Sequence, residues 1–184
     1  MEAVSNMLKG VDRATRLVEQ LLTLARLDPE SSRKDFEYVD LVGITGRVIS
    51  EHANMAVSKD IDLGLDADSE GHLYGLPDAL EVMLRNLVDN AVKYTPHGGR
   101  VDVSVREDEH GVTLTVADTG PGIDEELRTR VFDRFYRVLD NHNDGCGLGL
   151  SIVQRIAELH QAEIALNKTQ STGFEITIIF PYEF

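Results

Sequence analysis

The chain has 184 residues, of which 42% are hydrophobic and 27% charged, and its formal net charge is −14. This composition predicts one globular domain with an appended segment, and the negative charge disfavours binding to nucleic acid or to anionic membranes. No apolar run reaches the roughly 20 residues of a membrane-spanning helix, no secretory signal is visible, and the single cysteine excludes an internal disulfide. We therefore expect a soluble chain in the cytoplasm.

The first 28 residues predict one long helix, because apolar residues recur at alternating steps of three and four. Asp28 and Pro29 end it, since the residue before a proline is pushed out of the helical region. The broad apolar stripe is typical of a helix in a bundle whose other helices come from elsewhere. The stripe comprises Val4, Met7, Val11, Ala14, Val18, Leu21 and Ala25, widened by Leu8, Leu17, Leu22, Leu24 and Leu27.

A polar linker at residues 29–35 precedes a second, compact domain at 36–184. Residues 36–39 predict a short strand, and Asp40 is suited to cap a helix that runs to about Ser58. We expect four residues of this helix to face inward: Ile44, Val48, Ile49 and Ala53.

The middle of this domain alternates between strand and helix patterns. Apolar residues alternate with polar ones at 61–65, 101–105 and 112–116, and Gly111 marks a hairpin between the last two strands. Pro77 is a natural first-turn residue for a helix that runs to 94. Its apolar side carries Leu80, Met83, Leu84, Leu87, Val88 and Ala91.

The last third has weaker periodicity. Residues 120–145 predict a long loop with a helical turn or two, followed by a helix at 148–160 and strands at 164–166 and 174–180. Helices mixed with antiparallel strands indicate an α+β protein, a two-layer α/β sandwich preceded by one long helix.

One polar face on the 77–94 helix suggests a binding site. At 100° per residue, Asn86, Asn90 and Lys93 fall within about 60° of one another, opposite the apolar stripe. Amide oxygens and an ammonium group on one face can hold Mg²⁺ and the phosphates that it bridges. A solvated helix face is the alternative, and it is the commoner case for one helix taken alone.

Asp118 ends a predicted strand and is followed by Thr119, Gly120, Pro121 and Gly122. A carboxylate at this point can accept a hydrogen bond from an amine such as that of adenine, and the glycines let the backbone approach a flat ring. The alternative is a tight turn in which Asp118 bonds to its own backbone.

A local excess of positive charge interrupts the acidic chain at residues 128–137. Four guanidinium groups there could neutralise a triphosphate, or could pair with the acids at 124–126, and we expect at least one to do the latter. Two phenylalanines, Phe132 and Phe135, are expected to anchor this loop to the body of the domain. The arginines are Arg128, Arg130, Arg134 and Arg137.

Three glycines, Gly145, Gly147 and Gly149, surround the start of the 148–160 helix. Glycines at a helix start expose backbone N–H groups to phosphate, and the helix dipole adds attraction. The alternative is a flexible hinge, and both can hold in a loop that closes over a ligand.

These motifs together resemble the four nucleotide-binding sequence boxes of bacterial sensor histidine kinases, members of a superfamily that includes gyrase, Hsp90 and mismatch-repair ATPases. The boxes are LRNLVDNAVKYTP at 84–96, DTGPGI at 118–123, VFDRFYR at 131–137 and GCGLGLSIV at 145–153. Together with RLVEQLLTLARLD at 16–28, they resemble the QseC class of two-component sensors.

The resemblance implies a Bergerat ATP-binding fold that takes ATP and Mg²⁺, with Asn90 as the metal ligand. Asn86, Lys93, Arg134 and Arg137 would then be catalytic, the two arginines from a lid over the nucleotide. The implied nucleotide-binding residues are Asn86, Asn90, Lys93, Tyr94, Asp118, Gly120, Gly122, Ile123, Phe135, Gly145, Gly147, Leu148, Gly149 and Leu150.

Position 86 favours phosphoryl transfer over ATP hydrolysis. Gyrase-like and Hsp90-like relatives carry a Glu there as general base, whereas the amide of Asn86 cannot take a proton from water at neutral pH. Sensor kinases carry the acceptor His in an HELRTP-like sequence, and none of the six histidines of this chain has that context. We therefore expect a kinase fragment that does not phosphorylate itself, with residues 1–28 resembling the second helix of the dimerisation hairpin.

The implied partners are ATP, a cognate response regulator and an upstream acceptor helix. The full-length parent would be a homodimeric receptor anchored in the bacterial inner membrane, and the fragment would self-associate weakly without binding nucleic acid. The alternatives are a regulatory nucleotide-binding module and a stand-alone ATPase of the same superfamily.

Overall fold

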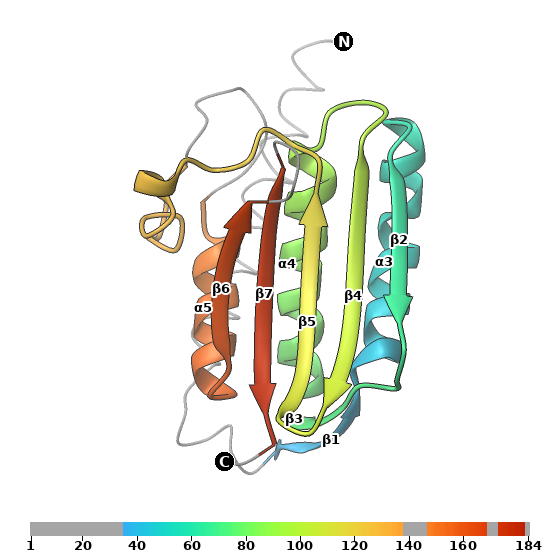
Figure 1. The fold of residues 1–184 in the computed structure, drawn as a ribbon, viewed down its shortest axis with the longest axis vertical. Helices are drawn as coiled ribbons and strands as arrows, with labels where there is room; N and C mark the ends of the chain where they lie inside the picture. Colours follow the sequence, from blue (N-terminus) through green and yellow to red (C-terminus); the bar gives the residue numbers. More distant parts are fainter. Residues whose placement is uncertain (1–34, 138–146, 169–172, 183–184) are drawn as a thin grey trace, which may run out of the picture.

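The computed structural model describes residues 35–137, 147–168 and 173–182. The predicted helix at 1–28, most of the linker, and Gly145 lie outside these residues. The described part has two layers, with the helices packed on one face of the main sheet (Figure 1), which confirms the predicted two-layer α+β sandwich. None of the helices within the described ranges is long and apolar enough to cross a bilayer.

The main sheet has five strands in the order β2-β4-β5-β7-β6. The β2–β4 pair is parallel and the other pairs are antiparallel, and β4 and β5 form the predicted hairpin, with Asp108 opposite Gly111. Alternate residues of β4 and β5 are buried against the helices, as a sheet with one covered face requires. The strands are β2 Asp62–Ala67, β4 Arg100–Asp108, β5 Gly111–Asp118, β6 Glu163–Lys168 and β7 Phe174–Pro181.

Three helices supply the other half of the core: α3 Leu41–Ser58, α4 Pro77–Tyr94 and α5 Gly149–Leu159. Asp40 caps α3 as predicted, because its Oδ1 accepts a hydrogen bond from the Gly43 N–H at 2.7 Å. The prediction that Ala53 faces inward is wrong, since this residue is exposed. The buried face of α3 continues instead at steps of four, through Val48 to Ala56.

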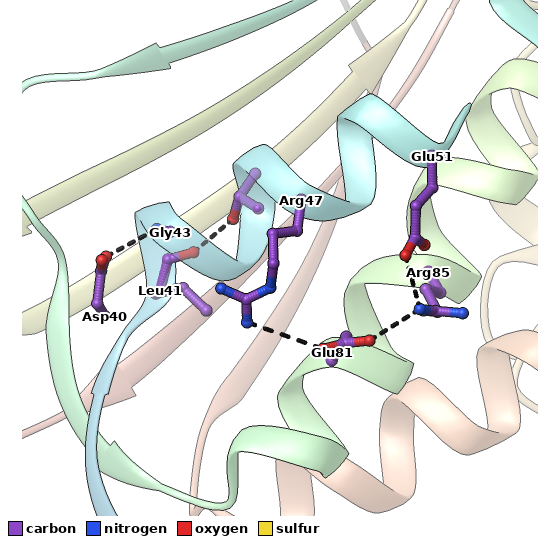
Figure 2. A network of polar contacts seen from close by, with 8 residues as sticks. Asp40, Leu41, Gly43, Arg47, Glu51, Glu81 and Arg85 are labelled. Atoms are coloured by element: carbon purple, nitrogen blue, oxygen red, sulfur yellow. Dashed lines mark hydrogen bonds and ion pairs between the residues drawn. The ribbon is translucent and has the colours of Figure 1, made fainter. Parts of the chain in front are cut away.

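Charged side chains line the outer side of the contact between α3 and α4 (Figure 2). Arg85 of α4 donates to Glu51 of α3 and to Glu81 of its own helix, both at 2.9 Å, and Arg47 lies 3.8 Å from Glu81. These side chains are between 30% and 63% exposed, so each pair contributes only about 0–1 kcal/mol. The apolar core, rather than this network, therefore holds the two helices together.

A second, two-stranded sheet lies at the start of the domain. It pairs β1, Glu37–Asp40, with β3, His72–Gly75, in antiparallel register. The sequence did not predict β3, because a four-residue strand has only two inward positions, too few to show a period of two. The aromatic rings of Tyr38 and Tyr74 meet on its outer side, with centroids 5.5 Å apart.

The topology brings the predicted motifs to one end of the molecule. The C-terminal ends of α4 and β5 lie together at the top of Figure 1, and the segment after β5 runs outward from there past β6. The described part of this segment, up to residue 137, contains a 3-10 turn at Glu125–Leu127, in agreement with the predicted long loop with a helical turn or two. The site is therefore built at this end, between α4, the loop after β5 and the start of α5.

Candidate functional site

The polar face of α4 has the predicted composition. Asn86, Asn90 and Lys93 are half-buried, whereas the opposite side of the helix is part of the core. Asn86 Nδ2 donates to the carbonyl of Val82 at 2.8 Å, which leaves the amide oxygen directed toward α5. Lys93 Nζ lies 5.5 Å from the ring centroid of Tyr94, its neighbour on the helix.

The first residue of α5 packs directly against the two asparagines. A methyl group at Gly149 would lie 3.0 Å from Asn86 Oδ1 and 3.5 Å from Asn90 Nδ2. The N-cap residue, Leu148, makes no side-chain hydrogen bond to the helix start, and the first N–H groups of an α-helix have no partner within the helix. A helix N-terminus beside amide side chains is suited to phosphate.

Asp118 ends β5 and is held by the backbone around it. Its Oδ1 accepts from the Gly120 N–H at 2.7 Å and from the Phe174 N–H of β7 at 3.4 Å. Burial raises the pKa of Asp118 above its ordinary value, and these two hydrogen bonds partly offset that shift. The contact with Gly120 is the turn expected under the alternative interpretation, but the Phe174 contact also fixes the carboxylate across the sheet.

The loop after Asp118 packs on the end of α4. A methyl at Gly120 would lie 3.1 Å from the Tyr94 carbonyl oxygen and 2.8 Å from Asp118 Oδ1. Gly122 has a φ of 73°, a conformation that an L side chain rarely adopts. The glycines therefore let the Asp118 loop approach α4 closely, which places Asp118 and Tyr94 at the same corner.

Arg128 and Arg130 contact other parts of the protein. Arg128 donates to the carbonyls of Ile123 at 3.4 Å and Leu166 at 3.2 Å, which ties the loop to β6. The Arg130 guanidinium lies 4.2 Å from the ring centroid of Tyr136, and its Nε is 3.9 Å from Asp133. Arg128 and Arg130 thus contact carbonyls, a ring and Asp133, not the upstream acids that we expected as partners.

We expected the Phe135 side chain to anchor this loop to the body of the domain, but Phe135 is 60% exposed, so the prediction is wrong for this side chain. Its backbone makes the contact, because the Phe135 N–H donates to the Gly147 carbonyl at 2.9 Å. Both residues have positive φ, and a methyl at Gly147 would lie 2.7 Å from the Phe135 carbonyl carbon. Val131, which is buried, is the apolar anchor, and Phe132 is half-buried.

The other predicted site residues are placed as follows. Arg134 is exposed and Arg137 is half-buried, and Ile123 and Leu150 are also half-buried. Leu148 is fully buried in the core, so its side chain supports the helix start from behind.

The described residues thus join the four motifs through α4 and the start of α5. Asn86 and Asn90 meet Gly149, Tyr94 meets Gly120, and Gly147 meets the segment ending at Tyr136. Within the described ranges, no group of three His, Cys, Asp or Glu side chains could hold a metal.

Two contributors to the site had no signal in the sequence. The Phe174 N–H is a backbone group of a distant strand, and Lys59 reaches the end of α4 with its side chain from the end of α3. Both contacts join residues more than 30 positions apart, through main-chain atoms that no sequence pattern marks.

Comparison with known proteins gives the family. Residues 75–183 match the family model described as histidine kinase-, DNA gyrase B- and HSP90-like ATPase. The sensor protein kinase PmrB of Pseudomonas aeruginosa is 39% identical over 175 residues, which cover 94% of this chain and 36% of PmrB. The chain spans 36% to 39% of the length of the curated relatives considered, PmrB and the QseC sensors.

Solved structures show the same fold. The cytoplasmic segment of histidine kinase QseC superposes with a TM-score of 0.66 at 33% identity, covering 94% of this chain and 95% of that chain. Full-length ShkA in complex with AMPPNP gives a TM-score of 0.83 at 28% identity, covering 98% of this chain and 38% of that chain. The chain therefore belongs to the histidine kinase-, DNA gyrase B- and HSP90-like ATPase family, and it contains the ATP-binding catalytic domain of a sensor histidine kinase.

Proposed function

We propose that this domain binds Mg-ATP at the corner between α4 and α5 and transfers the γ-phosphate to a histidine for relay to a response regulator. The observation that carries the proposal is the packing of Gly149 against Asn86 and Asn90. This contact brings a helix N-terminus, suited to phosphate, onto amide groups that suit a hydrated magnesium ion.

Each end of the site has its own chemistry. The fixed carboxylate of Asp118 would accept a hydrogen bond from the adenine amine, with Gly120, Gly122 and Tyr94 forming the surroundings of the ring. At the other end Asn90 would hold Mg²⁺, because amide oxygen is a hard ligand of the kind that this ion prefers. Asn86 and Lys93 would contact the phosphates, whose charge the bound ion helps to neutralise.

Transfer to a histidine is favoured over hydrolysis by residue 86. Its amide can position a phosphate but cannot remove a proton from water. Arg134 and Arg137, on the segment that contacts Gly147, would stabilise the charge on the phosphoryl group in transit. Among the described histidines, His160 is fully buried with both ring nitrogens hydrogen-bonded, so it is not a suitable acceptor.

We expect the acceptor on another segment, because none of the six histidines of this chain has the HELRTP-like context. We propose that residues 1–28 are one helix of a dimerisation hairpin, joined by the linker at 29–35 to the catalytic domain at 36–184. The domain would work on the cytoplasmic side of a membrane-anchored receptor, and a response regulator would take the phosphate from the receptor's histidine.

Calorimetry with ATP and ADP, with and without Mg²⁺, tests the binding step. Asn90→Ala should abolish most of the magnesium-dependent affinity, because it removes an inner-sphere oxygen. Asn54→Ala, at an exposed position on α3, is the matched control and should bind like the wild type. Equal affinities in both variants would refute the assignment of Asn90.

Labelling with γ-labelled ATP tests the transfer step. The purified chain should gain no acid-labile label on its own, but should phosphorylate an added hairpin fragment that carries an acceptor histidine. Binding without transfer to any such fragment would indicate a regulatory nucleotide-binding module. Rapid ATP turnover without an acceptor would indicate a stand-alone ATPase.

A further inference from the structure

Lys59 lies at the junction between α3 and the end of α4, outside all four motifs. It is the C-terminal cap residue of α3, and its N–H donates to the carbonyl of Ala56. Its own carbonyl accepts from the Gly98 N–H at 3.0 Å. The backbone of Lys59 thus ties the end of α3 to the loop that follows α4.

The side chain of Lys59 binds the C-terminal end of α4. Its Nζ donates to the carbonyls of Val92 at 2.7 Å, Lys93 at 2.8 Å and Thr95 at 2.8 Å. An ammonium group has three protons, so these three bonds use all of them. A cation at this position also complements the negative end of the helix dipole.

The segment that Lys59 holds is the one that carries the proposed nucleotide contacts. Lys93 supplies one of the three bound carbonyls and Tyr94 follows it in the chain, and the Tyr94 carbonyl packs against Gly120 of the Asp118 loop. A methyl at Gly99 would lie 2.8 Å from Thr119 Oγ1, so the loop after α4 also contacts the residue next to Asp118. A shift of this helix end would displace both the ammonium of Lys93 and the base-binding loop.

We propose that Lys59 is a positioning residue for the nucleotide site: it fixes the end of α4 in the place where Lys93, Tyr94 and the Asp118 loop meet the nucleotide. This inference rests on the proposed Mg-ATP site. An ammonium group is required rather than any polar group, because the three carbonyls converge on one point and each accepts a separate proton.

The nucleotide affinity of the folded protein distinguishes this role from that of an ordinary helix cap. A cap affects nucleotide binding only through the fraction of folded protein, whereas a positioning residue changes the affinity of the folded protein itself. Lys59 is half-buried at this junction, and the burial lowers the pKa of its ammonium group.

The test compares ADP binding by Lys59→Met, which keeps most of the length of the side chain but removes the charge, with binding by Thr45→Val. Thr45 is a buried residue that donates to the Leu41 carbonyl at 2.7 Å at the other end of α3, so its loss destabilises the fold without touching the site. At a temperature where both variants are folded, Lys59→Met should bind Mg-ADP about tenfold more weakly than the wild type, the equivalent of one charged hydrogen bond. Thr45→Val should bind within about twofold of the wild type.

Lys59→Arg should recover part of the lost affinity, because it restores the charge but not the three convergent donors. Equal affinity in Lys59→Met and the wild type would overturn the proposal and leave Lys59 as a structural cap. If the wild type itself does not bind ADP, the proposed function fails instead.

A second test of the proposal uses the wild-type protein alone. Hydrogen exchange at the Thr95 and Gly98 amides, which bond to the carbonyls of Ala91 and Lys59, should slow by several-fold on saturation with Mg-ADP. Unchanged exchange at both amides in the saturated protein would show that this corner is not coupled to the nucleotide, and would overturn the proposal even if Lys59→Met does not fold.

Discussion

Gly149 and Asn86 lie so close that a single added methyl group at Gly149 would reach 3.0 Å from the Asn86 amide oxygen. The two residues come from different motifs and are more than 60 positions apart in the chain. Their contact sets the distance between α4 and the start of α5. It therefore sets the width of the space that phosphate and magnesium would share.

Gly149→Ala should weaken Mg-nucleotide binding while leaving the fold as stable or more so. The added methyl would press on Asn86 and Asn90, but alanine favours a helix over glycine by about 1 kcal/mol. Gly46→Ala is the control, because Gly46 lies in α3 with nothing within 4 Å of the added methyl. Calorimetry should show loss of affinity only in Gly149→Ala. Wild-type affinity in that variant would contradict the proposed location of the phosphates.

Asp118→Asn should raise the thermal stability of the unliganded domain at neutral pH and reduce its affinity for adenine nucleotides. Burial raises the folded pKa of Asp118 above 3.8, so the ionised carboxylate costs stability above that pKa. The asparagine keeps an oxygen for the Gly120 and Phe174 amides but carries no charge. Each kcal/mol regained should raise the melting temperature by about 2–4 °C.

The pH dependence of the stability tests whether the charge of Asp118 causes this difference. The cost of the Asp118 carboxylate is fully present above the raised folded pKa and disappears below 3.8, where both states are protonated. The stability difference between Asp118→Asn and the wild type should therefore shrink as the pH falls through this window. A constant difference across the whole range would assign the effect to packing instead.

Much of this site could be predicted from the sequence, because its motifs are local. The polar face of α4 follows from the period of the helix, and the Asp118 turn follows from three glycine and proline residues beside a strand end. The anchoring of the loop could not be predicted, since the choice between the side chains of Val131 and Phe135 depends on tertiary packing. Lys59 was missed for a similar reason: it binds carbonyl groups, which every residue has.

His160 should make the domain sensitive to mild acid. Its ring is fully buried, with Nδ1 donating to the Ile156 carbonyl at 2.8 Å and Nε2 accepting from the Leu76 N–H at 3.0 Å, so it is held neutral. Burial lowers the folded pKa of His160 below its ordinary 6.5. Stability is therefore fully present above pH 6.5 and is lost as the pH falls below it, because the unfolded state takes up the proton first.

Denaturant unfolding at several pH values measures this loss. His160→Gln should be less stable at neutral pH, since it loses the ring contacts with Phe36 and Phe180, but it should lack the decline that starts near 6.5. His110→Gln, at an exposed position, should decline like the wild type. The same decline in His160→Gln as in the wild type would assign the acid sensitivity to other groups.

The apolar stripe at residues 1–28 should make the chain self-associate at high concentration. This segment lies outside the described residues, so the prediction rests on the sequence pattern alone. Each stripe residue that is buried contributes roughly 1.5–3 kcal/mol, and four valine and leucine side chains at positions 4, 11, 18 and 21 can face a second copy of the helix. Sedimentation should show a concentration-dependent dimer that disappears when the first 30 residues are deleted, while ADP affinity is retained. A strictly monomeric chain would show that the stripe is covered by the catalytic domain of the same molecule.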